Sequence, residues 1–195
     1  MGELAGDRFV EVEVTSEAEL HEWLSTHHDQ QDAVWLITYK KAAPNKYITH
    51  EQVLDQLIAY GWTDGIRRRI GDERSMQLIS PRRTQPWAKS YKDRAERLIA
   101  TNKMQVSGME SVEKAKATGM WDAMNDVDAL LMPEDLAAAL AQHEPAAHHF
   151  ASFPVSTQRN ILRWIASAKT EATRAKRIAR TAVEAQQNIR VKSNG

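Results

Sequence analysis

The segment 61–89 combines tryptophan, aspartate, arginine and lysine side chains in a pattern suited to binding an anion. Arginines occur in a predicted strand and again immediately before a predicted helix start. Planar guanidinium groups and the free backbone N–H groups of a helix N-terminus both bind phosphates and carboxylates. The segment therefore predicts an anion-facing surface whose candidate ligand-binding residues are Trp62, Asp64, Arg68, Arg82, Arg83, Trp87 and Lys89.

The same segment contains one candidate for acid–base chemistry. Asp64 follows Trp62 closely, and a carboxyl group buried beside an aromatic ring can have a raised pKa. Arg82 and Trp87 would then bind a substrate in a cleft beside the helix start. A helix cap or an ion pair is the competing structural role of Asp64. The catalytic residues therefore stay unassigned, and a small enzyme is the alternative to a non-catalytic binding protein.

Strand geometry limits how many of these cations can share one pocket. In an extended strand Arg67 and Arg69 point to one face and Arg68 to the other. Ordinary ion pairs to Asp72 and Glu73 are the structural alternative to ligand binding. Lysines also alternate with aromatic residues at 87–92, a combination that nucleic-acid-binding surfaces use. The aromatic rings, however, lie on an apolar helical stripe, which favours a role in the core. A nucleic-acid partner is therefore only weakly supported.

Several classes of chemistry lack the residues they need. The chain of 195 residues has no cysteine, which excludes disulfides, thiolate nucleophiles and Cys-ligated metals. Its 7 histidines show no spacing typical of a metal site. Motifs for nucleophilic hydrolysis, nucleoside triphosphate binding and dinucleotide binding are also missing. We therefore expect neither a cofactor nor a metal.

The elements that must position the candidate site alternate in the first hundred residues. Alternation of apolar and acidic residues predicts an early or edge strand at 9–14, and the β-branched run 33–40 predicts a buried strand. Capping-box spacings begin helices after Ser16 and Thr49, and Gly61 suits the end of the second helix. The polar turn at 71–73 then predicts a hairpin. The pattern is therefore β-α-β-α-β-β.

From residue 86 onward the apolar periodicity is almost entirely helical. We expect an α+β fold with a small sheet, flanking helices and a helical C-terminal region. The predicted regions are 1–104 and 105–195, packed as one compact unit, and a loop at 125–132 is a weaker boundary. In the last helix, alanines with Ile178 and Val183 predict the buried arc, with arginines and Lys176 on the opposite side.

Charge is distributed unevenly although the formal net charge is zero. Residues 66–103 carry a net charge of +7 and residues 1–65 carry −8. Mutual neutralisation in the fold is one explanation, and a surface for an anionic ligand or an acidic protein partner is the other. The start of the chain lacks the pattern of an export signal, and no run of about 18 apolar residues predicts a membrane span. We therefore expect a cytoplasmic location.

Five spaced motifs show a resemblance to a known family. They are VWLITYKK at 34–41, YGWTDG at 60–65, SPRRTQPW at 80–87, AKATGMW at 115–121 and RWIASAKTEATRAKRI at 163–178. In these motifs the chain resembles the YdeI/OmpD-associated, or bacteriocin-protection, proteins from about Glu17 to Ile189. The part after about Met132 resembles their OmdA domain. The resemblance implies a stress-related role but no particular reaction.

Overall fold

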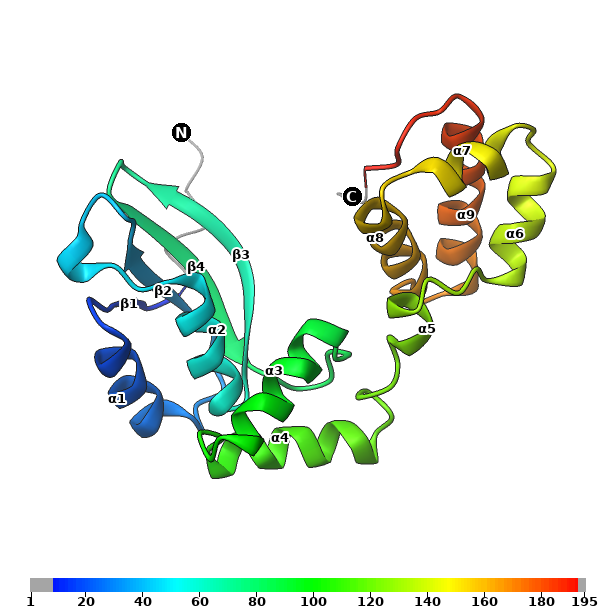
Figure 1. Cartoon of the computed structure of the whole chain (residues 1–195). Coiled ribbons are helices and arrows are strands. Elements are labelled where there is room, and N and C mark those ends of the chain that lie inside the picture. The colour runs from blue at the N-terminus through cyan, green and yellow to red at the C-terminus, as the bar shows by residue number, and fades with distance from the viewer. Residues whose placement is uncertain (1–8, 193–195) are drawn as a thin grey trace. The chain divides into compact units, whose positions relative to one another are not determined.

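A computed structural model describes residues 9–192 of the chain, which divides into two compact units between Asp122 and Ala123 (Figure 1). Residues 1–7, which lack the pattern expected of an export signal, lie outside the described residues. The first unit contains the sheet and four α-helices, and the second is helical in its described part. The α+β fold class is therefore confirmed.

The sheet has four strands in the order β1-β2-β4-β3. Their bounds are Glu11–Glu13, Val34–Tyr39, Trp62–Ile70 and Arg74–Pro81 for β1 to β4. The short β1 pairs in parallel with β2 at one edge, as predicted, and the other pairs are antiparallel. The predicted hairpin is the β3–β4 pair, whose register shifts between Asp64 and Arg67. The sheet is therefore a mixed one that ends in a long hairpin.

The helices of the first unit begin and end largely where local signals place them. They are α1 (Glu17–His27), α2 (His50–Ala59), α3 (Lys89–Ala100) and α4 (Val106–Ala117), with a short 3₁₀ turn at Pro44–Lys46. The predicted capping box before α2 is complete, because Thr49 and Gln52 cap each other. Gly61 ends this helix with φ +76°, in the left-handed region that favours glycine.

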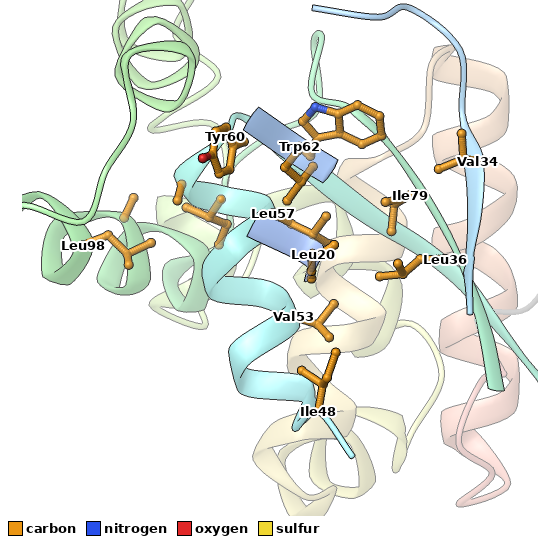
Figure 2. Packing of buried hydrophobic residues seen from close by; sticks show 14 of the residues in the cluster. Leu20, Val34, Leu36, Ile48, Val53, Leu57, Tyr60, Trp62, Ile79 and Leu98 are labelled. Carbon is orange, nitrogen blue, oxygen red and sulfur yellow. The ribbon is translucent and has the colours of Figure 1, made fainter. Parts of the chain in front are cut away.

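One face of the sheet packs against α1 and α2 to form the core of the first unit. Figure 2 shows Leu20 of α1 and Leu57 of α2 pointing toward Leu36 and Ile79 of the strands. All four side chains are buried, with 0 or 1 % of their surface exposed. Burial of apolar surface, at about 25 cal/mol per Å², therefore fixes which face of the hairpin lies toward the helices.

Helix α4 belongs to the first unit, so the structural division lies after it and not at the predicted 104/105 boundary. Gly108 of α4 lies against α2, where any Cβ would clash with the Ala59 carbonyl oxygen. Val112 and Ala115 of α4 complete the same core. Close helix packing through a glycine thus extends the unit beyond the predicted boundary.

The second unit contains α5 (Asn125–Asp128), α6 (Glu134–Ala141), α7 (Ala146–Ser152), α8 (Val155–Ala166) and α9 (Glu171–Gln186). Its core joins Leu136, Phe150 and Ile165, each at most 1 % exposed. Within residues 9–192, no helix is long and apolar enough to cross a membrane.

The predicted buried arc of α9 was wrong in part. Ile178 and Ala182 are buried as expected, but Val183 is 44 % exposed. Three further residues of the predicted arc, Ala172, Ala175 and Ala179, are also exposed. Thr181 is fully buried instead, because its hydroxyl donates to the Arg177 carbonyl oxygen at 2.8 Å and thereby satisfies its polar group. The buried side of α9 is therefore rotated from its predicted position toward the arginines. The prediction counted only apolar residues as buried and so missed Thr181, whose hydroxyl has a partner within the helix.

Candidate functional site

The register of the hairpin separates the predicted site residues into two groups. Trp62 pairs with Pro81 at the start of β3, whereas Arg68 pairs with Met76. Arg83 lies seven positions after Met76 along β4 and its extension, a span of roughly 23 Å at about 3.3 Å per residue. Arg68 therefore lies far along the hairpin from Arg82 and Arg83, and cannot contact the same small ligand.

Asp64 is the centre of a hydrogen-bond network. Its Oδ2 accepts a hydrogen bond from Gln77 Nε2 at 2.8 Å, and its Oδ1 accepts one from the Tyr91 hydroxyl. Gln77 comes from β4 and Tyr91 from α3, so the carboxylate joins the hairpin to the helix. Both of its oxygens are thus engaged by the protein.

Arg82 lies between two aromatic rings of the α3 region. Its guanidinium carbon is 4.3 Å from the centroid of the Trp87 ring and 4.8 Å from that of Tyr91. Its Nη2 donates to the Thr63 hydroxyl at 3.2 Å. Burial lowers the pKa of Arg82 to about 10, and the negative charge of Asp64 opposes part of that shift.

The loop after β4 wraps around this arginine. The Arg82 backbone N–H donates to the Gly61 carbonyl at 2.9 Å, while Arg82 Nη1 reaches the carbonyl oxygens of Gln85 and Pro86 at 3.4 and 3.5 Å. Arg82 Nε is buried without a hydrogen-bond partner among residues 9–192. These contacts make Arg82 a positioning residue that fixes the approach to α3.

Trp62 and Trp87 are core residues and cannot present a ring to a ligand. They are 0 and 1 % exposed. The Trp62 ring packs edge-on against Trp23, with 5.5 Å between centroids, and Trp87 lies 5.1 Å from Trp121. The core role favoured for the ring of Trp87 in the lysine-rich segment is confirmed.

Three exposed arginines of the hairpin region have neutral partners. Arg67 Nη2 donates to the Ser75 hydroxyl at 3.0 Å, Arg68 lies 5.0 Å from the Trp35 ring centroid, and Arg83 Nη2 donates to the Gln31 carbonyl at 2.8 Å. Within residues 9–192 no carboxylate forms an ion pair with any of the three. In contrast, Arg69 forms an ion pair with Asp72, as in the structural alternative to ligand binding. Arg83 and the Arg67–Arg68 pair therefore keep positive charge at the two ends of the hairpin.

The start of α3 differs from a usual helix N-terminus in its capping and its charge. Its N-cap residue is Ala88, in an extended conformation (φ −72°, ψ 155°), and no side chain among the described residues caps the helix. The first turn contains no acid, and it includes Lys89, whose ammonium pairs with Asp93 at 2.7 Å. Arg83 lies five residues before this uncapped end. A helix start without a side-chain cap and the cationic residues Arg83 and Lys89 thus lie close together in the sequence.

Sequence reasoning missed three members of these networks: Gln77, Thr63 and Trp121. Alternation along β4 could have placed Gln77 on the same face as Ile79, next to Asp64. Trp121 had no such signal, because its contact with Trp87 depends on the chain returning after α4. The Trp87 N–H donates to the Met120 carbonyl at 2.9 Å, which fixes this return. No group of His, Asp or Glu within the described residues could hold a metal ion.

Two family matches divide the chain in the same way as the structure. DUF8412, described as a domain of unknown function, matches residues 12–111, inside the first unit. OmdA, described as bacteriocin-protection, YdeI or OmpD-associated, matches residues 129–188 in the second unit. Comparison with curated proteins and with solved structures found no match. The chain therefore belongs to the DUF8412 family in its first unit and has an OmdA domain of the YdeI/OmpD-associated family in its second.

Proposed function

We propose that the first unit binds an anionic ligand at the uncapped start of α3, without catalysing a reaction. One observation carries this proposal: the N-terminus of α3 has no capping side chain among the described residues and no acid in its first turn. In the sequence Arg83 precedes Ala88 by five residues and adds positive charge, and Lys89, which pairs with Asp93, follows Ala88 directly. The bound group would be a phosphate or a carboxylate.

The electrostatics of a helix favour an anion at this position. The aligned peptide dipoles place about half a positive charge at a helix N-terminus, where an anion gains roughly 0.3–1 kcal/mol. The same partial positive charge of the helix N-terminus repels a lysine side chain instead of stabilising it. An incoming anion would accept hydrogen bonds from backbone N–H groups at the helix start and offset the repulsion between the dipole and the nearby cations.

The buried network behind α3 supports a rigid site more than a reactive one. Arg82 is held between Trp87 and Tyr91, and Asp64 accepts hydrogen bonds at both oxygens. A general base needs a lone pair directed at the substrate, whereas both carboxylate oxygens of Asp64 already face protein donors. The alternative of a small enzyme at Asp64, Arg82 and Trp87 has less support for this reason.

The description of the OmdA family suggests a biological role for this anion binding. A family described by bacteriocin protection supports a stress-related role for the anion-binding protein. A nucleic acid or an acidic protein could present the same phosphate or carboxylate chemistry at the basic end of the hairpin. The size of the ligand would distinguish these partners from a small anion.

Isothermal titration of the whole protein with inorganic phosphate, inorganic polyphosphate and citrate at low and high salt tests the proposal. The double variant Arg83→Ala, Lys89→Ala should bind at least about tenfold more weakly, because each charge-assisted contact contributes roughly 1.5–3 kcal/mol. Arg67→Ala is the matched control, since Arg67 is also exposed and donates to a neutral oxygen, at the other end of the hairpin. Equal losses in both variants would contradict the assignment, as would the absence of any binding.

A further inference from the structure

A second site for a small molecule lies near the opposite end of α3, among the helices of the first unit. It is a hollow of about 280 Å³ lined by α1, α2, the end of α3 and the residues just before α4. The buried side chains of Ala59 and Leu98 contribute apolar surface, and the rest of the lining is polar. A volume near the lower limit of ligand pockets suits a small molecule.

A carboxylate held by neutral donors lies on one side of this hollow. Glu17 is half-buried, and its two carboxylate oxygens accept hydrogen bonds from Gln52 Nε2 and Gln56 Nε2, each at 2.8 Å. Both donors are neutral amides, and no ion pair to Glu17 occurs among residues 9–192. Two α2 side chains therefore fix the carboxylate in place without neutralising its charge.

The second carboxylate in the lining has a different role. Asp55 forms ion pairs with both Arg94 and Arg97 of α3. Arg94 also pairs with Glu51, so the two arginines and the two carboxylates compensate each other. Glu17 is therefore the acid in the hollow that has only neutral partners, and each of its oxygens keeps a second lone pair for a cationic group of a ligand.

Lys103 and Asn102 contribute another part of the lining. Asn102 ends α3 in the left-handed conformation with φ 54°, and the Lys103 N–H closes this end by donating to the Leu98 carbonyl at 2.8 Å. Within the described part of the chain, the side chains of Lys103 and Asn102 make no hydrogen bond or ion pair. The ammonium and the carboxamide can therefore bind an anionic group.

We propose that this hollow binds a small zwitterion of the free amino acid class, with its ammonium at Glu17 and its carboxylate at Lys103 and Asn102. A carboxylate held in place and an ammonium without a protein partner among the described residues line the same small polar hollow, and a ligand that carries both charges matches them. His21 Nδ1 donates to Gln56 Oε1 at 3.1 Å and thereby orients the amide whose Nε2 donates to Glu17. This site is independent of the proposed anion site at the start of α3.

The test is titration of the whole protein with free L-amino acids, followed by amide chemical shifts, with methylamine and acetate as probes of a single charge. We expect one or more amino acids to bind, and both single-charge probes to bind at least about tenfold more weakly. Glu17→Gln and Lys103→Gln should each weaken amino acid binding about tenfold or more. Glu22→Gln is the control, because Glu22 is an exposed acid on α1 outside the lining.

Three outcomes would overturn this proposal: no amino acid binds, the substitutions Glu17→Gln and Lys103→Gln both leave the affinity unchanged, or methylamine binds as tightly as the amino acids. If Glu17→Gln fails to fold, the exposed Lys103→Gln substitution still decides the question. Addition of phosphate should not displace the amino acid. Competition between phosphate and the amino acid would show that both bind at one site and would refute the independence of the two proposed sites.

Discussion

Substitution of Ala88 by aspartate should affect folding and binding in opposite directions. Ala88 has the extended N-cap conformation, and the carboxylate of an aspartate there can accept hydrogen bonds from N–H groups of the first turn of α3. Replacing alanine by a capping residue gains about 1 kcal/mol, and a negative charge at the helix start adds roughly 0.3–1 kcal/mol. The expected gain in the free energy of unfolding is therefore about 1.5 kcal/mol.

Differential scanning calorimetry and phosphate titration of the same samples measure both effects. A gain of about 1.5 kcal/mol corresponds to a rise in Tm of roughly 5 °C for a unit of this size. Phosphate affinity should fall at least about tenfold, because the new carboxylate occupies the same N–H groups and repels the anion. Ala88→Asn supplies a cap without a charge and separates the two causes. A stabilised Ala88→Asp variant with unchanged phosphate affinity would refute the location of the anion site.

Three further predictions concern the packing around the two sites and the second unit. Tyr91→Phe removes the hydroxyl that donates to Asp64, so a partly buried carboxylate oxygen loses its partner. The free energy of unfolding measured by chemical denaturation should fall by about 1–3 kcal/mol. An unchanged value would mean that water replaces the hydroxyl at no cost. Gly108→Ala introduces a clash with the Ala59 carbonyl and should cost about 1–3 kcal/mol, whereas Gly119→Ala, which meets no atom within 4 Å, reports only the strain of a left-handed residue. Arg174 lowers the pKa of Asp135 in the second unit, so this pair stabilises the fold above the ordinary pKa of 3.8 and loses that effect as pH falls below it. Arg174→Ala should therefore cost up to about 1 kcal/mol at neutral pH and little at pH 2, and an equal cost at both pH values would contradict the electrostatic origin.

Local signals were sufficient for most elements of the first unit. Thr49 and Gln52 form the predicted capping box, and Gly61 has the predicted positive φ. A capping box or a helix-ending glycine depends only on residues within three or four positions of each other. The local sequence is therefore enough to predict it. The hairpin was also predictable, because the polar turn at 71–73 separates two short segments that each favour an extended backbone.

The candidate site was less predictable, because its geometry depends on contacts between distant segments. Arg82 was expected to face a ligand, yet its guanidinium lies between Trp87 and Tyr91. Sequence spacing could not show that the loop at 83–86 folds back to bring these rings together. The hairpin register likewise separates Arg68 from Arg83, and only the pairing of β3 with β4 gives this distance. Nothing in the sequence indicated the hollow around Glu17, because its parts come from several helices.

The two family matches leave out residues that the first unit requires. DUF8412 ends at residue 111 and OmdA begins at residue 129. Between them, Val112 and Ala115 are in the core of the first unit, and the Met120 carbonyl accepts a hydrogen bond from the Trp87 N–H. The Trp121 ring then covers Trp87, the residue that also contacts Arg82. Residues 112–122 therefore complete the support of the α3 start, and the physical unit that carries the proposed anion site extends to Asp122.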